Sequence, residues 1–320
     1  MRKRLLILGA TGYLGTVATQ RLLEARHAIV ALCQPGHDAI PVRGNLELRH
    51  GDVTDPASLT GAVTDDIDGV LYYVPPTGDA EVDRNAIEAL LAPLRGTGRL
   101  FMYVSGTWVL GPSGRRALQE DSPPNPIELV AYRPNLERQV LDAAAAGVRS
   151  VVVRAGVVHG RGGGIPAMLV AWAAQAGAGR YVGDTPGHWP MVHVEDLADL
   201  VEAVVERATP GMLLHAVAEP AVPVTELARA AAQAAGVSGV RPWPLDQARE
   251  ALGAAFADAL ALDQSVLGEW TQRSLGWRPR GIDAVTDLAT GSYRQEAGSG
   301  ELDAQDKGRQ PVGSAAASGW

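Results

Sequence analysis

The sequence predicts an α/β fold: a doubly wound parallel sheet with helices on both faces and a smaller, mostly helical C-terminal lobe. Short, almost wholly apolar runs alternate with helix-length segments over the first half of the chain, as is typical of strands buried on both faces. A glycine-rich turn follows the first run and opens the first helix. The length of 320 residues suits one large domain with an added lobe.

The expected strands are short, and the first leads directly into a helix at about residues 13–25. In chain order they are LLILGA at 5–10, AIVALC at 28–33, LELRHGDV at 46–53, GVLYYV at 69–74, RLFMYVS at 99–105, SVVVRAGVV at 150–158 and a last strand at about 212–217. Parallel strands joined by helices end at one edge of the sheet, which is where ligands bind in folds of this class.

The chain divides into a core and a lobe at the glycine-rich stretch after residue 160. We expect residues 1–160 to form a dinucleotide-binding core, with 190–217 returning to it. Residues 161–189 and 218–295 are expected to form a substrate-binding lobe. Gly, Ser, Ala, Asp and Gln dominate residues 296–320, which we expect to be a disordered tail because they cannot bury enough apolar surface.

Composition restricts the partners. The formal net charge of −8 argues against nucleic acid or an anionic membrane, since both require a basic surface. Cys33 is the single cysteine, and no Cys/His cluster has zinc spacing, so we expect no disulfide and no metal. No apolar run approaches the roughly 18 residues of a membrane span. We expect a cytoplasmic protein with a small-molecule substrate and no nucleic-acid or membrane partner; a homodimer stays open.

The stretch GATGYLG, residues 9–15, is the strongest local signal. A chain that turns tightly from strand to helix needs glycines, and a backbone without Cβ atoms can approach a pyrophosphate closely. The N–H groups that begin the helix then face the phosphates. We expect cofactor contacts along this loop, from Gly9, Thr11, Gly12, Tyr13, Leu14 and Gly15.

Four further segments carry a resemblance to a known family: GDVTDPASL at 51–59, YVPPT at 73–77, VRAGVVHG at 153–160 and PMVHVEDLADL at 190–200. With the glycine loop, they make the chain similar to the extended and atypical short-chain dehydrogenase/reductase superfamily, the NAD(P)-dependent epimerase/dehydratase-like proteins. The resemblance covers about residues 4–290 and implies a Rossmann-like fold and an NAD(P) cofactor, in an enzyme that we expect to serve specialised metabolism.

The resemblance also implies which residues meet the two ends of the cofactor. Asp52 and Val53 take the position of the adenine contact, and Val74 and Pro75 that of the nicotinamide-ribose side. The second strand ends in Gln34, where an acidic residue would select NAD and a nearby arginine NADP. Because nothing acidic there repels the extra phosphate, the sequence leans to NADP.

The hydroxyl of the family's active site has two candidates in VSGTWVLG. Alignment places Gly106 at the usual hydroxyl position, with Ser105 and Thr107 on either side. Thr107 is the preferred candidate. Ser105 stays open between a catalytic role and satisfying backbone groups at the strand end.

Tyr132 aligns with the family tyrosine, a general acid or base toward a substrate oxygen. The family lysine four residues later, which makes that tyrosine reactive, is replaced by Leu136. Arg133 and Arg138 are not expected to replace it, because residues at i+1 and i+6 do not share the tyrosine's helix face. A neutral phenol still donates a proton, so we expect Tyr132 to serve reduction better than oxidation.

Expected substrate contacts are aromatic, apolar or imidazole side chains: Trp108, His159, His188, Trp189 and Met191. They favour a small, fairly hydrophobic substrate over a nucleotide sugar. His193 is expected to be structural.

Three functions stay open. The first is an NAD(P)-dependent oxidoreductase that reduces a carbonyl of a small, fairly hydrophobic metabolite with Tyr132 as proton donor. The second is a non-redox isomerase, cyclase or dehydratase on the same scaffold. The third is a cofactor-binding redox sensor. Oxidation of NAD(P)H by a test carbonyl separates the first from the others.

Overall fold

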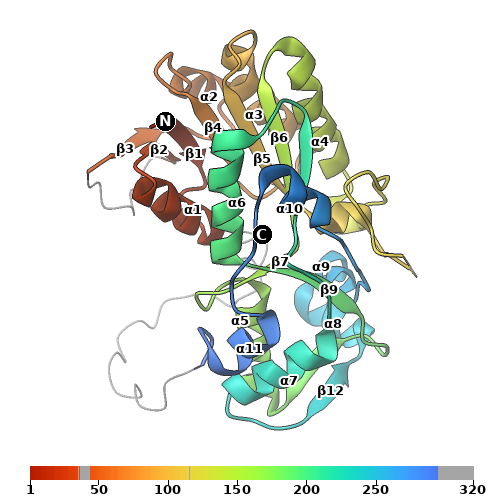
Figure 1. Ribbon diagram of the computed structural model, residues 1–320. Coiled ribbons are helices and arrows are strands. Elements are labelled where there is room, and N and C mark those ends of the chain that lie inside the picture. Colours follow the sequence, from red (N-terminus) through yellow and green to blue (C-terminus); the bar gives the residue numbers. More distant parts are fainter. Residues whose placement is uncertain (35, 37–43, 115, 295–320) are drawn as a thin grey trace.

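A seven-stranded sheet organises the larger part of the molecule (Figure 1), in the order β10-β6-β5-β4-β1-β2-β3. All its neighbouring strands are parallel, which confirms the predicted doubly wound sheet. The computed structural model describes residues 1–34, 36, 44–114 and 116–294, so the tail expected at 296–320 lies outside the described residues. The strands are β1 (Arg4–Leu8), β2 (Ala28–Cys33), β3 (Leu46–His50), β4 (Gly69–Tyr72), β5 (Leu100–Gly106), β6 (Arg149–Ala155) and β10 (Met212–Ala216).

Helices cover both faces of this sheet because its strands are apolar on both sides. On one face, α1 (Tyr13–Glu24) and α6 (Val194–Arg207) share a core with the strands. On the other face, a second core joins the strands to α2 (Pro56–Ala62), α3 (Ala80–Leu91) and α4 (Arg133–Asp142). The sheet is therefore buried between two helical layers, as its continuous Val, Ile and Leu runs predict.

The sequence predicts one strand at 150–158, and this prediction is wrong in its length: Gly156 divides the segment into two strands. A Cβ atom at this glycine would lie 2.6 Å from the carbonyl oxygen of Pro190, so the chain passes a neighbouring backbone too closely for any side chain. Beyond it, β7 (Val157–His159) leaves the large sheet and pairs with β9 (His188–His193). The break sends the chain from the core into the lobe.

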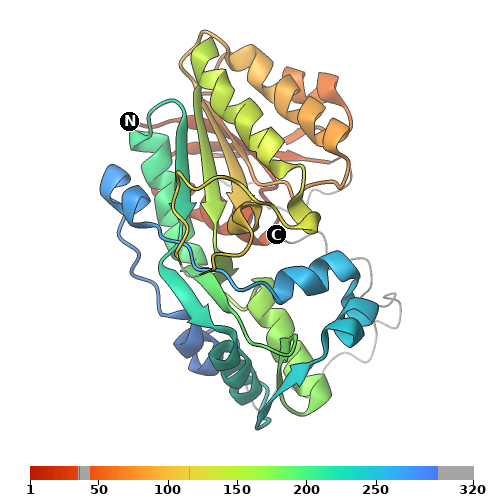
Figure 2. The same cartoon turned by 90° about the vertical axis from the view of Figure 1, so that its right-hand side faces the viewer.

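The lobe lies at one end of the sheet (Figures 1 and 2) and has its own apolar core. It contains two small sheets of short strands, and most of its regular structure is helical, as the sequence predicts. The sheets are β11-β9-β7 and β12-β8, completed by β11 (Glu219–Pro223), β8 (Gly179–Val182) and β12 (Val240–Trp243). The lobe helices are α5 (Gly164–Ala176), α7 (Val224–Ala234), α8 (Leu245–Leu252), α9 (Ala254–Leu260) and α11 (Ala284–Thr290).

The remaining helical elements join these parts. They are α10 (Glu269–Leu275), which packs near β10 and α6, and the 3-10 turns η1 (Ala92–Leu94), η2 (Thr107–Leu110), η3 (Glu128–Val130) and η4 (Ala143–Ala146). Across the described ranges, no helix has both the length and the apolar character that crossing a membrane requires.

Candidate functional site

The glycine loop forms a tight cradle between β1 and α1. Gly9 has a φ of 79°, a conformation that favours glycine, and its carbonyl accepts a hydrogen bond from the backbone N–H of Gly12 at 3.0 Å. A Cβ atom on Gly15 would lie only 2.1 Å from that same carbonyl oxygen. The loop therefore needs glycine at these positions, and α1 begins with no acidic residue in its first turn. This is the arrangement that receives a phosphate group.

A cavity of about 220 Å³, here called the loop cavity, lies beside this cradle at the ends of β1 and β2. It brings together five of the expected cofactor residues, Gly9, Thr11, Gln34, Val53 and Val74. Leu8, Leu32, Cys33, Gly51 and Leu59 complete its wall. Pro75 is not part of this wall, although it follows Val74 directly.

Asp52 lies between Gly51 and Val53, two residues of the wall of the loop cavity. Its carboxylate accepts a hydrogen bond from Nε2 of Gln34 at 3.0 Å and two from Thr54 at 2.8 Å. The backbone N–H of Thr54 is the first cause that lowers the pKa of Asp52, so the carboxylate is charged at neutral pH. The lean to NADP rested on the absence of an acidic residue at the end of β2. Asp52, which follows β3, nevertheless places a carboxylate 3.0 Å from Gln34.

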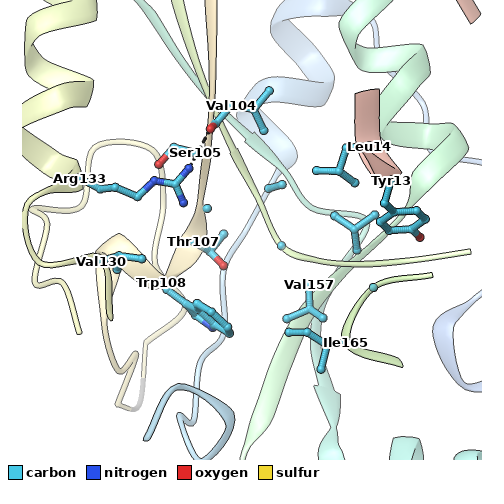
Figure 3. A pocket seen from close by; sticks show the side chains of 15 residues that line it. Tyr13, Leu14, Val104, Ser105, Thr107, Trp108, Val130, Arg133, Val157 and Ile165 are labelled. Atoms are coloured by element: carbon cyan, nitrogen blue, oxygen red, sulfur yellow. Dashed lines mark hydrogen bonds between the residues drawn. The ribbon is translucent and has the colours of Figure 1, made fainter. Parts of the chain in front are cut away.

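A second cavity, here called the β5 cavity, has a volume of about 80 Å³ and lies at the carboxyl ends of β5 and β6 (Figure 3). Tyr13 and Leu14 of α1 line it, so the start of α1 separates it from the loop cavity. Its wall is mostly apolar and comprises Tyr13, Leu14, Val104, Ser105, Gly106, Thr107, Trp108, Val130, Arg133, Ala155, Gly156, Val157, Val158, Gly164 and Ile165.

Two aliphatic hydroxyl groups belong to this wall, those of Ser105 and Thr107, besides the phenol of Tyr13, which donates to the carbonyl oxygen of Gly160 at 2.7 Å. The side chain of Ser105 is 3% exposed, and its Oγ has no hydrogen-bond partner within the described part of the chain. Thr107 is held by Gln264, whose Nε2 donates to the carbonyl oxygens of Thr107 at 2.9 Å and Gly111 at 2.7 Å. An unpartnered buried hydroxyl costs free energy, which a ligand in the cavity can recover.

Arg133 is the cation of the β5 cavity, and its guanidinium lies beside Ser105 (Figure 3). Its Nη2 donates to the carbonyl oxygen of Val104 at 2.9 Å, and its Nε donates to the hydroxyl of Tyr103 at 3.1 Å. Sequence reasoning missed this residue, having excluded it because it does not share a helix face with Tyr132. The two residues do point in different directions, but the arginine is the one that faces the cavity.

Tyr132 lies outside the β5 cavity, in a groove between α3 and α4. Its hydroxyl donates to Oδ2 of Asp83 at 2.7 Å and accepts from the backbone N–H of Gly78 at 3.1 Å. Burial, and then the hydrogen bond to Asp83, raise the pKa of this phenol. Tyr132, which the sequence predicts to act on the substrate, therefore does not line the β5 cavity. Successive residues at a helix start point about 100° apart, and Arg133 takes the direction toward the cavity.

The model of the NAD dependent epimerase/dehydratase family matches residues 5–214. The chain belongs to this family. An uncharacterized protein of Schizosaccharomyces pombe is 30% identical over 91% of this chain and 99% of its own. The dTDP-4-dehydrorhamnose reductase of Mycobacterium tuberculosis is 28% identical over 77% of this chain and 80% of its own.

The fold is also shared with solved structures. UDP-glucose 4-epimerase of Thermus thermophilus, described in complex with NAD, superposes with a TM-score of 0.74 at 19% identity. The match covers 92% of this chain and 99% of that one, so it extends over the lobe as well as the core. Together, these similarities establish a Rossmann-like scaffold of the short-chain dehydrogenase/reductase superfamily for the chain.

This epimerase/dehydratase family member departs from the expected pair of tyrosine and lysine. In the expected pair the tyrosine lies four residues before the lysine. If Arg133 supplies the cation of the β5 cavity in place of that lysine, the matching tyrosine position is Leu129, which packs among apolar side chains. An ion pair of 2.6 Å between Arg154 of β6 and Glu137 of α4 fixes this helix against the sheet. It thereby also fixes which residues of α4 face the β5 cavity. No phenol that could act as a proton donor therefore replaces Tyr132 at that spacing.

Three of the expected substrate contacts lie away from both cavities. Trp189 and Met191 are buried in the core of the lobe, at 2% and 0% exposure. His188 is exposed and pairs with Asp263 at 3.0 Å. Of the five expected contacts, Trp108 lines the β5 cavity.

His159, the fifth, is buried in a polar cluster with His193 and Asp287. Its Nδ1 lies 3.0 Å from Oδ2 of Asp287, and the candidate ligand atoms of the three residues lie within 4.8 Å of one another. A tetrahedral zinc site needs ligands about 3.4 Å apart, given bonds of about 2.1 Å. Burial alone would raise the pKa of Asp287, but hydrogen bonds from His159 and Ser292 outweigh it and lower the pKa. The cluster thus fastens α11 to β7. His193 accepts the backbone N–H of Glu195 and begins α6, which fits a structural role.

Proposed function

We propose that the protein is an NAD(P)-dependent oxidoreductase that reduces a carbonyl group in the β5 cavity. The observation that carries this proposal is the buried, unpartnered Oγ of Ser105 in an apolar cavity beside the glycine loop. Such a hydroxyl is suited to donate a hydrogen bond to a carbonyl oxygen of a ligand. The reductase named among the relatives and the neighbour described with NAD support the same reaction class.

The glycine cradle fits a dinucleotide. Gly9 and Gly15 leave no room for a Cβ atom where the loop meets α1, and the two cavities lie on either side of that helix start. Thr11, Gln34 and Val53 would hold the adenosine end. When bound, the reduced nicotinamide supplies the hydride that the carbonyl carbon receives. We propose NAD as the dinucleotide, because the charged Asp52 beside Gln34 disfavours an added phosphate there.

The residues of the β5 cavity would stabilise the negative charge that develops on the carbonyl oxygen. Ser105 and Thr107 donate hydrogen bonds to this oxygen, and the Arg133 guanidinium stabilises its charge electrostatically. An arginine stays protonated and does not give up its proton, whereas a hydroxyl both donates and accepts. The proton that completes the alcohol therefore reaches the oxygen through these hydroxyls from solvent. Trp108 and Ile165 limit the cavity to a small or apolar group.

The test is NADH and NADPH titration followed by turnover with a panel of small aldehydes and ketones. We expect tighter binding of NADH than NADPH, and a Ser105→Ala variant that binds NADH normally but reduces carbonyls more slowly. Absence of binding to both dinucleotides would remove the proposal.

A non-redox isomerase, cyclase or dehydratase is the second candidate, favoured by the outward position of Tyr132. Without the Tyr132 phenol in the cavity, the hydroxyls of Ser105 and Thr107 and the guanidinium of Arg133 could polarise a carbonyl while no hydride moves. Product formation with unchanged NADH absorbance would identify this function.

A further inference from the structure

Arg133 is a buried cation whose two hydrogen-bond partners carry no charge. It is 6% exposed, and it donates to the hydroxyl of Tyr103 and the carbonyl oxygen of Val104. Burial raises the pKa of Tyr103, so its phenol stays neutral and provides no counter-charge. Among the described residues, no carboxylate forms an ion pair with Arg133. A buried charge without a partner of opposite sign is costly.

The carboxylates nearest in the fold are engaged elsewhere. Glu137, one turn further along α4, binds Arg154 with contacts of 2.6–3.2 Å. Asp83 accepts the hydroxyl of Tyr132 at 2.7 Å and the backbone N–H of Thr77 at 3.0 Å. Neither is left to neutralise Arg133. The counter-charge therefore has to come from the β5 cavity, into which the guanidinium faces (Figure 3).

A carboxylate group on a ligand would supply this counter-charge at the Arg133 end of the β5 cavity. A guanidinium binds a carboxylate through parallel N–H donors, and the unpartnered Oγ of Ser105 beside it stays available for the carbonyl oxygen of the same ligand. The volume of about 80 Å³ is roughly half that of a cavity that accepts benzene, so the enclosed space takes a short head group. The walls formed by Val157 and Ile165 suit a short alkyl group attached to that carboxylate.

We infer that Arg133 forms a carboxylate-binding subsite in the β5 cavity, and that the substrate class is small oxo-carboxylates. The substrate class rests on the proposed reduction of a carbonyl, whereas binding of a carboxylate by Arg133 does not. The subsite places the carboxylate of such a substrate at Arg133, with its carbonyl oxygen next to the hydroxyls of Ser105 and Thr107.

The test is calorimetric binding of isobutyrate and its uncharged amide, isobutyramide, to the full chain with and without NADH. One charge-assisted hydrogen-bonded pair corresponds to a preference of roughly 10- to 100-fold for the carboxylate. Arg133→Met is expected to bring the ratio near one, while Arg133→Lys keeps part of it. Arg138→Met is the matched control, because Arg138 is an exposed cation on the same helix and its loss should leave the ratio unchanged.

The outcomes separate this inference from the proposed function. Equal affinity for isobutyrate and isobutyramide in the wild type would overturn the subsite, even if neutral ketones are reduced. A carboxylate preference that survives in Arg133→Met, together with weakened NADH binding, would also overturn it and assign Arg133 to the dinucleotide. A preference lost in Arg133→Met, with no NADH binding in any variant, would uphold the subsite and reject the oxidoreductase.

Discussion

Arg133 and Arg154 are both buried guanidinium groups beside helix α4, at 6% and 3% exposure, but their partners differ. Arg154 is paired with the carboxylate of Glu137 at 2.6 Å. Arg133, one turn before Glu137, has neutral hydrogen-bond partners and faces a cavity. The difference teaches that one buried cation has its counter-charge supplied by the fold, whereas the other is available to a ligand. The first is structural, and the second lies where we propose the functional site.

The largest expected effect is loss of the fold's own ion pair. Glu137→Gln leaves Arg154 as a buried charge without a carboxylate, so we expect the free energy of unfolding to fall by about 3–5 kcal/mol. Urea denaturation measures it. Arg133→Met breaks no ion pair but removes the donor to the Tyr103 hydroxyl and the Val104 carbonyl, so we expect a smaller loss of about 1–2 kcal/mol. Equal losses in the two variants would show that the two arginines do not differ as described.

The second expected effect concerns pH. Burial, reinforced by the charge of Arg154, lowers the pKa of His215 from 6.5 to about 4. As the pH falls, His215 is therefore protonated in the unfolded chain before it is protonated in the folded chain. The contribution to stability that is fully present above about pH 6.5 is lost between pH 6.5 and pH 4. From pH 7 to pH 5 this histidine should cost about 2 kcal/mol of unfolding free energy. Urea titrations at both pH values measure it, and His215→Gln should flatten the dependence. An unchanged slope in that variant would contradict the assignment.

The third expected effect is smaller and concerns the other side of α4. Tyr132→Phe removes the hydrogen bond to the buried carboxylate of Asp83, which keeps the N–H of Thr77 as a donor. We expect a loss of about 1–2 kcal/mol in unfolding free energy. Val82→Ala, also on α3, is a control for general loosening of that helix. A variant as stable as the wild type would mean that the Tyr132–Asp83 bond is not formed in solution.

The sequence predicts the sheet well, because most of its strands are apolar runs; β3 (LELRH), at the edge of the sheet, is the exception. It also predicts the glycine loop, whose spacing is a local property. The break at Gly156 was missed because it depends on the backbone of Pro190, which is distant in the chain. A glycine inside a strand-like run was the available signal.

Side-chain direction was harder to predict than the fold. At the start of α4, a shift of one residue rotates a side chain by about 100°, so alignment alone could not decide between Tyr132 and Arg133. Trp189 and Met191 lie on β9, and packing within the lobe turns them into its core. Asp52 meets Gln34 only because β3 lies beside β2 in the sheet. Each of these depends on contacts between segments that are far apart in sequence.

The central claim is that the chemistry takes place at Ser105 in the β5 cavity and not at Tyr132. The most direct measurement is kcat/KM for NADH-dependent carbonyl reduction by the wild type, Ser105→Ala and Tyr132→Phe, with NADH affinity determined for each. We predict a loss of roughly 10- to 100-fold for Ser105→Ala, equivalent to one transition-state hydrogen bond, and a change within about twofold for Tyr132→Phe. A large loss for Tyr132→Phe with an unaffected Ser105→Ala would contradict the claim.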